Sequence, residues 1–318
     1  MSVQNENEYE DLLGLWSDLE SGLGVILGSP GSIQEFEKRV RQYDRWMQTL
    51  LQRDADVGLY LLFQLATNSP VGYSASHSLV SAVLCHLVAA ELNLGAAERD
   101  SLIHAALTMN IAMTALQDEL AGQEEKPNAE QQMAIKTHAV KGGMMLANLH
   151  VTDPLWLDVV SQHHDDSNDH GTLQSLSSAA RLGRILRTVD RYAAMISPRK
   201  SRLGRSSTDS IRSIIGSGAH KDEVGHALVG AVGLCPPGTY VRMDNNELAV
   251  VIRRSNTANF PYVAVVITKA GEPLPQPRLH RTADATPKIQ AALAASAVRA
   301  RINHHLVLQL GAYVAQHP

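Results

Sequence analysis

Cysteine and aromatic residues are scarce in this chain. Its 318 residues include two cysteines, Cys85 and Cys235, and aromatic residues make up 4% of the sequence. Two cysteines form no disulfide framework, and Cys85 lies in an apolar helical stretch, which predicts a small core residue rather than a nucleophile. The scarcity of aromatic residues, together with abundant leucine and alanine, favours helices.

A strong charge imbalance and a long apolar run are also missing. The net charge of −4 gives no general reason to expect nucleic acid or an anionic membrane as a partner. The chain has no run of 18 or more apolar residues, so we expect no membrane span. The beginning "MSVQNENEYE" is too polar and acidic for a signal peptide. We therefore expect a cytoplasmic protein of bacterial type.

Hydrophobic periodicity predicts a mainly α fold with a small β-appendage. Apolar residues recur at helical spacing in the ranges 9–27, 33–50, 78–94, 98–120, 129–149, 154–164, 175–196 and 207–231. After "CPPG" the period changes, and "TYVRM", "ELAVVIRR" and "YVAVVIT" predict short antiparallel strands, with Asn245-Asn246 as a hairpin turn. "GEPLPQP" is expected to end this block, and a closing helix is predicted over 286–314.

These patterns divide the chain into three parts. They are an N-terminal helical region (1–68), a helical domain (69–232), and the β-appendage with the closing helix (233–318). In the first part, the apolar stripe Ile33–Leu50 alternates by three and four, but it is shorter than the three to four heptads of a coiled coil. The stripe either packs onto the main domain or forms the surface of a homodimer.

Four of the fourteen histidines stand at or near helical segments in a notable order. His77 lies in "YSASHSLV", His138 in "IKTHAV", and His163 and His164 in "SQHHDDSNDHG", while Asp190 follows in "LRTVDRYAAM". Two adjacent imidazoles followed by carboxylates are hard to explain as core packing, and this combination suits divalent transition metals. The spacing leaves two interpretations open, a metal site and a hydrogen-bonded polar cluster without metal.

A further stretch, "AALTMNIAMTALQ", predicts a buried helix with one amide, Asn110, in its middle. An unpaired buried amide costs about 1–3 kcal/mol, so this residue needs an explanation.

The order of these motifs resembles that of the HD-GYP family, the helical metal-dependent phosphodiesterases of the HD superfamily that open cyclic di-GMP. In the family, "HSxxV" is followed by "AALLHDIGK", "KTHP", "HHExxxGxGYP" and a "D" before "DAMTSxRPYR". Here "HSLV" keeps His77, "KTHA" keeps His138, and "HHD" keeps His163 and His164, while "VDRYAAMISPRKSR" keeps Asp190. The resemblance implies an HD-superfamily helical bundle in which these five residues are metal ligands.

The departures from the family pattern affect the residues that carry out the family's chemistry. Against "AALLHDIGK" this chain has "AALTMNIAM", so Met109 and Asn110 stand in place of the HD pair, and Met113 replaces the lysine. In the family, the aspartate bridges two cations, which lie about 3.5–4 Å apart in such sites. Asn110 supplies no charge, and the thioether of Met109 is poorly matched to iron or manganese. We therefore expect these to be degenerate metal positions and the protein to have no significant phosphodiesterase activity.

The surviving residues leave open what the protein binds. His138, His163 and His164 are able to hold one divalent ion (Fe, Mn or Zn), or the site holds none. The resemblance also implies that Arg199 and Arg202 lie near a nucleotide or phosphate, which they would bind by bidentate contacts.

The motifs and their departures from the family pattern leave three functions open. The first is a catalytically impaired regulatory or scaffolding module of bacterial cyclic di-GMP signalling, with a signalling protein as partner and no assigned catalytic residue. The second is a metal-dependent phosphohydrolase with an unusual single-metal site. The third is a sensor that binds a cyclic dinucleotide without cleaving it.

Overall fold

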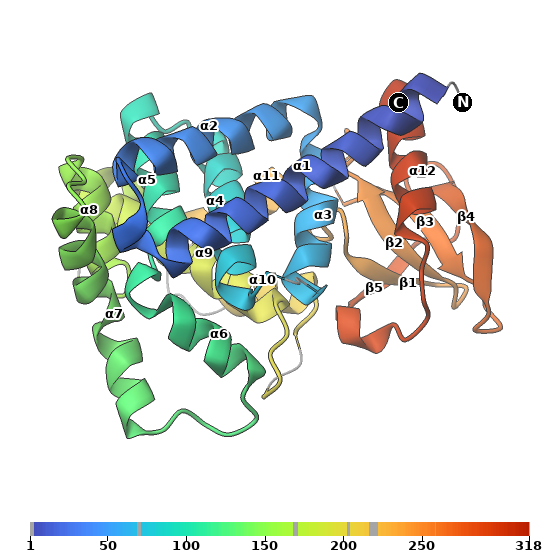
Figure 1. Ribbon diagram of the computed structural model, residues 1–318. Coiled ribbons are helices and arrows are strands. Elements are labelled where there is room, and N and C mark those ends of the chain that lie inside the picture. Colours follow the sequence, from blue (N-terminus) through green and yellow to red (C-terminus); the bar gives the residue numbers. More distant parts are fainter. Residues whose placement is uncertain are drawn as a thin grey trace.

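The protein consists of a helical body and a small antiparallel β-sheet, with a last helix packed beside the sheet (Figure 1). The computed structural model describes residues 3–68, 71–167, 171–201, 204–215, 222–257 and 259–317. The helices that precede the sheet are α1 (Val3–Gly28), α2 (Phe36–Arg53), α3 (Ala55–Asn68), α4 (Tyr73–Glu91), α5 (Ala96–Thr108), α6 (Thr114–Gly122), α7 (Ala129–Asn148), α8 (Pro154–Gln162), α9 (Ser178–Ile196), α10 (Ser207–Ile215) and α11 (Glu223–Val232). Short 3₁₀ turns are η1 (Pro30–Ser32), η2 (Ile111–Met113), η3 (Leu173–Ser175) and η4 (Ala295–Ala297).

Helix α4 forms the centre of the helical body. It packs against α1, α3, α5, α9 and α11, and 14 of its 19 residues are buried. With 19 residues and a mean hydropathy of 1.3, it is long and apolar enough to cross a membrane, but 78% of that segment is buried inside the protein. A helix that is apolar on all sides is expected at the core of a large bundle.

The helix predicted over 98–120 is broken in its middle. Asn110 has φ −104° and ψ 13°, and Met113 has φ −137° and ψ 22°, both outside the helical region. The backbone N–H of Met113 donates to the carbonyl of Asn110 at 2.8 Å, which closes the 3₁₀ turn η2 between α5 and α6. The prediction of one continuous helix is therefore wrong, because hydrophobic periodicity does not register a bend at a polar residue that favours turns.

The apolar stripe of α2 faces the interior of the same chain. Phe36, Val40, Met47 and Leu50 are at most 2% exposed and belong to the main hydrophobic core. Helix α2 packs against α1, α3 and α5. The stripe is therefore not an exposed dimer surface, and its spacing is explained by packing within the chain. Homodimerisation through other parts of the N-terminal helices stays a prediction.

A buried polar pair joins α2 to α5 within this core. Nε2 of His104 lies 3.1 Å from Oδ2 of Asp44, and the two side chains are 2% and 4% exposed. Gln48 donates a second hydrogen bond to Asp44 at 2.8 Å. The carboxylate is thus satisfied without water, as a buried charge requires.

The sheet contains β1 (Tyr240–Met243), β2 (Leu248–Arg253), β3 (Tyr262–Ile267), β4 (Pro273–Arg281) and β5 (Ile289–Leu293). All neighbours are antiparallel, in the order β4-β3-β2-β1-β5. The predicted turn between β1 and β2 is confirmed: Asn246 adopts φ 69°, which asparagine tolerates better than most residues.

Two predictions for the C-terminal part are wrong. "PLPQP" does not end the β-block but begins the edge strand β4, where a missing N–H does not interrupt the sheet. The long closing helix is replaced by β5, η4 and a shorter α12 (His304–Gln316). The alanine-rich segment Ile289–Leu293 becomes a strand because it pairs with β1, and such tertiary pairing overrides helix propensity.

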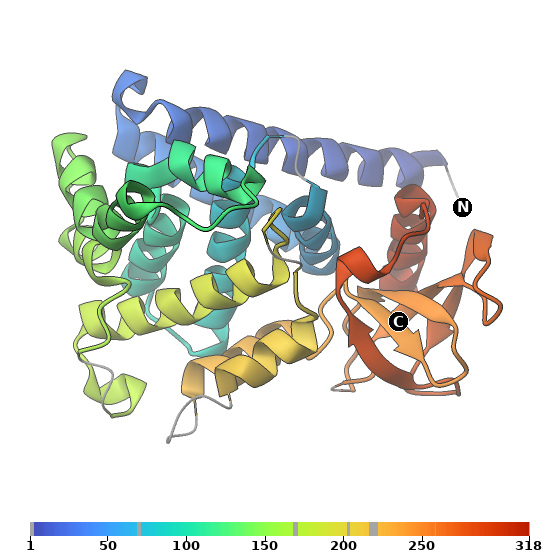
Figure 2. The same ribbon diagram turned by 90° about the horizontal axis from the view of Figure 1, so that it is seen from below.

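Ion pairs and a shared core join the sheet to the helical body. Arg253 forms an ion pair with Asp54 at 2.7 Å, and Arg254 forms one with Asp56 at 2.5 Å. Both aspartates lie at the start of α3. The main core continues from the helices into β2, β3 and α12, while a smaller cluster lies on the opposite face of the sheet. Figure 2 shows the sheet and α12 packed at one end of the helical body.

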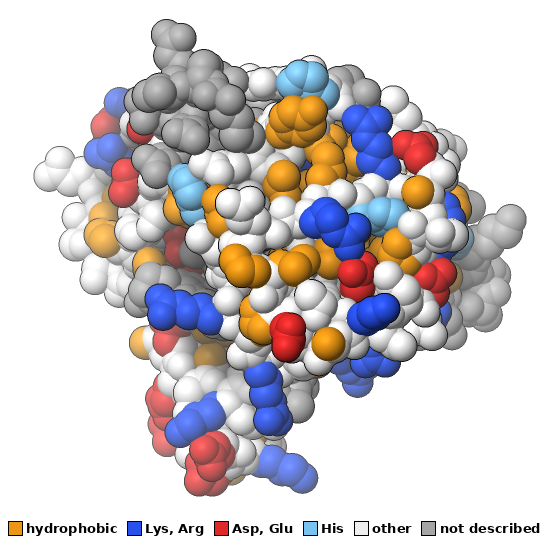
Figure 3. Space-filling view, turned by 90° about the vertical axis from the view of Figure 1, so that its right-hand side faces the viewer, with side chains coloured by type: hydrophobic (Ala, Val, Ile, Leu, Met, Phe, Trp, Pro, Cys, Tyr) orange, Lys and Arg blue, Asp and Glu red, His pale blue; other side chains and the backbone are white. Residues whose placement is uncertain are grey.

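The outer surface at the sheet end is mixed in character (Figure 3). Apolar side chains gather near the centre of this face, between basic and acidic side chains. The large apolar side chains exposed in the described part of this region are Phe260 and Tyr313, at 39% and 43%. Scattered exposed side chains of this kind are normal for a folded protein and indicate no particular partner.

Candidate metal centre

The histidines that stand in order along the sequence form one site in the fold. His77 lies on α4, His138 on α7, His163 and His164 at the end of α8, and Asp190 on α9. Helix α9 packs against both α4 and α8, and α7 packs on α8. Residues more than one hundred positions apart thus meet because four helices converge.

The start of α8 is fixed by a local capping interaction. The carboxylate of Asp153 accepts hydrogen bonds from the backbone N–H groups of Leu155 and Trp156, at 3.0 and 3.1 Å. Trp156 is fully buried, and its indole N–H donates to Thr108 at 2.8 Å. These contacts anchor the helix whose last turn presents His163 and His164.

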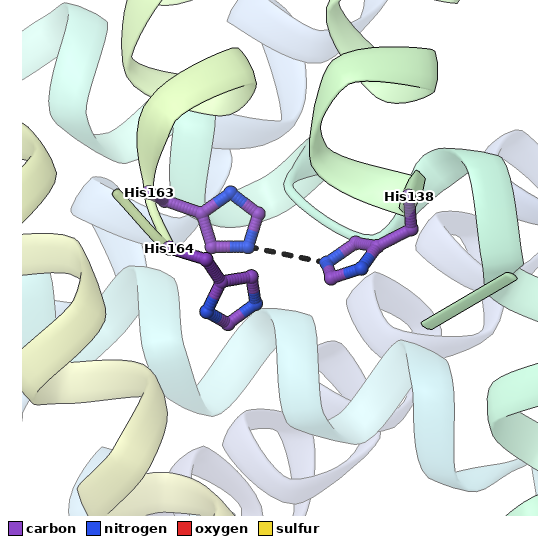
Figure 4. Close-up of side chains that lie close together, drawn as sticks. All are labelled: His138, His163 and His164. Atoms are coloured by element: carbon purple, nitrogen blue, oxygen red, sulfur yellow. Dashed lines mark hydrogen bonds between the residues drawn. The ribbon is translucent and has the colours of Figure 1, made fainter. Parts of the chain in front are cut away.

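The three imidazoles of His138, His163 and His164 form a compact cluster (Figure 4). One ring nitrogen from each lies within 4.8 Å of the others. The ring centroids are 4.1 Å apart for His163 and His164, and 5.0 Å apart for His138 and His164. His138 and His163 are buried, whereas His164 is exposed, so the cluster is open on one side.

The hydrogen bonds of two of these rings define where their lone pairs point. Nδ1 of His138 donates to the carbonyl of Ile135 at 2.5 Å, and Nδ1 of His163 donates to the carbonyl of Val160 at 2.7 Å. A carbonyl accepts only, so each Nδ1 carries the proton and each neutral ring has its lone pair on Nε2. The two Nε2 atoms face each other at 3.3 Å, joined by the dashed line in Figure 4.

Two facing lone pairs need a positive charge between them, either a proton or a metal ion. Burial, followed by the neighbouring His164, lowers the pKa of His163 to about 3, and burial also lowers the pKa of His138. A second proton on either ring is therefore disfavoured at neutral pH. Neutral histidines whose other nitrogen donates to a carbonyl are the usual form of metal-bound histidine. The three side chains therefore fit a cation better than a proton.

His77 and Asp190 form a second pair beside this cluster. Nε2 of His77 lies 2.7 Å from Oδ1 of Asp190; the His77 side chain is 1% exposed and that of Asp190 is 19% exposed. Burial raises the pKa of Asp190, but the hydrogen bond from His77 and the electrostatic interaction with the neighbouring imidazoles outweigh it and lower this pKa to about 2. Asp190 thus holds a negative charge close to the three imidazoles.

Met109 and Asn110 occupy the bend between α5 and η2. The Met109 side chain is fully buried in the main core, and Asn110 is 6% exposed. The bend packs against α7, where a side chain at Gly142 would come within 3.7 Å of the Met109 carbonyl. The structure shows a hydrogen bond of Asn110 through its backbone: the carbonyl of Asn110 closes the 3₁₀ turn.

Of the two arginines predicted to bind phosphate, Arg199 is already engaged. Its Nη2 donates to the hydroxyl of Tyr73 at 2.9 Å, and its guanidinium carbon lies 4.6 Å from the centre of the Tyr73 ring. Arg202 lies outside the described residues. The sequence motifs did not single out Tyr73, although its position four residues before His77 on one helix was an available signal.

Comparison with known proteins supports the resemblance seen in the motifs. No model of a known protein family matches the chain. A curated cyclic di-GMP phosphodiesterase of Pseudomonas aeruginosa is 27% identical over 216 residues, which cover 64% of this chain and 50% of that protein. The chain thus spans about half the length of this curated relative.

A solved structure has a similar fold. The HDG"Y"P protein of Bdellovibrio bacteriovorus matches with a TM-score of 0.51 at 11% sequence identity, over 72% of each chain. The architecture of this chain is a helical bundle with N-terminal helices and a C-terminal antiparallel sheet, and over the matched part its fold is similar to that of this protein. The chain is thus similar in sequence to a cyclic di-GMP phosphodiesterase and in fold to an HDG"Y"P protein.

Proposed function

We propose that this protein is a non-hydrolysing HD-GYP-like module of cyclic di-GMP signalling, which regulates or scaffolds a partner protein. The name of the Pseudomonas aeruginosa relative supports the signalling system. The observation that carries the loss of hydrolysis is the fully buried Met109 and the neighbouring Asn110, which stand in place of the family's histidine and aspartate.

Charge at the metal positions is the physical reason to expect no hydrolysis. A two-metal site holds its cations about 3.5–4 Å apart, so their repulsion must be offset by a bridging anion. Asn110 is neutral, and the buried thioether of Met109 is a soft ligand that hard cations avoid. Met113 also lacks the positive charge that would stabilise a phosphoryl group in the transition state. Each substitution weakens a different requirement of the hydrolytic reaction.

We further propose that His138, His163 and His164 hold a single divalent cation, either Fe, Mn or Zn. The facing Nε2 atoms at 3.3 Å support this, because a cation removes their repulsion. A bound cation at such a site acts as a Lewis acid on an oxygen ligand. Asp190, paired with His77, adds a negative charge nearby.

The test is an assay of cyclic di-GMP hydrolysis with the full chain, purified without a polyhistidine tag and supplied with Mn²⁺, Fe²⁺ or Zn²⁺. We expect no turnover above that of a His163→Ala variant. Metal-dependent turnover that disappears in His163→Ala would reject the proposal.

A second candidate, a phosphohydrolase with one metal, is favoured by the same three histidines. It predicts hydrolysis of a simpler phosphoester, such as p-nitrophenyl phosphate or its bis ester, again sensitive to His163→Ala. The third candidate, a sensor, requires a phosphate to compete with Tyr73 for Arg199. It predicts heat of binding in calorimetry with cyclic di-GMP at about 100 μM protein, enough to detect a micromolar site.

A further inference from the structure

The three buried imidazoles of the site are not held in the same way. His138 and His163 are each oriented by a hydrogen bond from Nδ1 to a backbone carbonyl. His77 has no such bond: its Nδ1 is buried and has no hydrogen-bond partner among the described residues. A metal-site histidine normally has its second nitrogen bound, because this fixes the ring orientation and the tautomer. Nε2 of His77 is bound to Asp190 at 2.7 Å, so a further contact has to replace the hydrogen bond that Nδ1 lacks.

That contact is the ring of Tyr73, one helical turn earlier on α4. The two ring centroids are 5.3 Å apart, and the planes are inclined by 13°, so the rings are stacked. Residues four apart on a helix lie on the same face, which brings the rings together without any distortion. Stacked aromatic pairs of this kind contribute about 0.5–1.5 kcal/mol beyond their buried area.

Arg199 holds Tyr73 through both its ring and its hydroxyl, and the next residue on α4 is also anchored. Arg199 lies over its ring at 4.6 Å and donates to its hydroxyl at 2.9 Å. The next residue, Ser74, donates from its backbone N–H and its hydroxyl to the carboxylate of Asp118, at 2.7 and 2.8 Å. The start of α4 is thus anchored, and contacts lead from Arg199 through the Tyr73 ring to His77.

We infer that Tyr73 is a positioning residue of the cation centre: its stacking on His77 replaces the Nδ1 hydrogen bond that orients His138 and His163, and it acts together with the bond from His77 to Asp190. This inference rests on the proposed single-cation centre. His77 in turn holds one oxygen of Asp190 at 2.7 Å, so the direction of this carboxylate depends on the His77 ring. Arg199 has the same positioning role, because it holds Tyr73 in place.

The test compares Tyr73→Leu, which removes the ring, with Tyr73→Phe, which keeps the ring and loses the bond to Arg199. The matched control is Tyr313→Leu. Tyr313 also stacks on a histidine four residues later, His317, at 4.4 Å and 19°, but on α12, away from the site. The probe is Mn²⁺ or Zn²⁺ alone, titrated into untagged metal-free protein by calorimetry.

We expect Tyr73→Leu to weaken cation binding about 10-fold, the lower end of the usual effect of losing an outer partner of a metal site, because Tyr73 acts through His77 and Asp190 and not on a ligand directly. Tyr73→Phe should stay within about threefold of the unchanged protein, and Tyr313→Leu should bind as the unchanged protein does. Arg199→Gln should give an intermediate loss, and it tests the same stack if Tyr73→Leu fails to fold. Equal affinity of Tyr73→Leu or Arg199→Gln and the unchanged protein, or an equal loss in Tyr313→Leu, would overturn the inference.

A second readout does not depend on the cation. Nitrogen NMR of the imidazole rings in metal-free protein reports the tautomer of His77, which should be mainly the Nε2–H form that faces Asp190. Tyr73→Leu should give a mixture of tautomers, and Tyr313→Leu should not. If the unchanged protein binds no cation, the proposed centre is wrong, and this NMR comparison still decides whether Tyr73 positions His77: an unchanged tautomer in Tyr73→Leu contradicts it.

Discussion

Cation binding at the three-histidine cluster should stabilise the folded protein, since the unfolded chain has no preformed site. The ligand atoms of His138, His163 and His164 lie within 4.8 Å of one another, and two of them face each other at 3.3 Å. A cation at 100 times its Kd adds about 2.7 kcal/mol to the free energy of unfolding. For a chain of this size, about 2 °C of Tm corresponds to each kcal/mol. The expected rise in Tm is therefore about 5 °C.

The assay is differential scanning calorimetry of untagged protein, with and without Zn²⁺ or Mn²⁺. His164→Ala is the most informative variant, because His164 is the exposed member of the cluster and its removal leaves the core intact. It should lose most of the Tm rise while keeping the metal-free Tm within about 1 °C, as is usual for surface substitutions. His305→Ala, at an exposed position on α12, is the matched control and should keep the full rise.

Two outcomes would refute this reasoning. One is an unchanged Tm of the original protein at saturating metal, which would mean that the facing imidazoles bind no cation. The other is an equal rise in His164→Ala and in the original protein, which would place the bound metal elsewhere.

Three further predictions concern other parts of the molecule. Asp44→Ala leaves His104 buried without its carboxylate and should lower the free energy of unfolding in urea by about 3–5 kcal/mol; a loss below about 1 kcal/mol would contradict the role of this pair. The double change Met109→His with Asn110→Asp should raise the metal content, measured by plasma mass spectrometry, from one ion per chain toward two; an unchanged content would show that more than these two side chains was lost. Val40→Asp places a charge at a position that is 1% exposed and should lower Tm without changing the molar mass in light scattering; dissociation of a folded dimer would instead restore the stripe as an interface.

Much of the helical body was predictable because its outer helices have one apolar side and its central helix α4 is a long apolar segment. Hydrophobic periodicity predicted the wrong element where contacts with a distant part of the chain decide the structure. The segment Ile289–Leu293 has the composition of a helix, and only its pairing with β1 makes it a strand. The stripe of α2 shows the same limit, since the spacing of Val40 and Met47 does not reveal whether the covering surface belongs to this chain or to a second copy.

The candidate site was predictable in its members but not in its geometry. The order of His77, His138, His163 and Asp190 along the chain was enough to nominate them, because the motif order resembles that of a known family. The sequence does not contain the direction of each ring, which depends on the backbone carbonyls of Ile135 within α7 and Val160 near the end of α8. For the same reason, the engagement of Arg199 by Tyr73 was not foreseen: a lone arginine in a motif does not reveal its partner.

The most direct test of the central claim is the number of ions at the site. Crystals of the untagged protein soaked in Mn²⁺ should give one anomalous peak, in contact with His138, His163 and His164. A pair of peaks about 3.5–4 Å apart, with Asn110 in contact with both, would contradict the claim, because a neutral amide would then be bridging two cations.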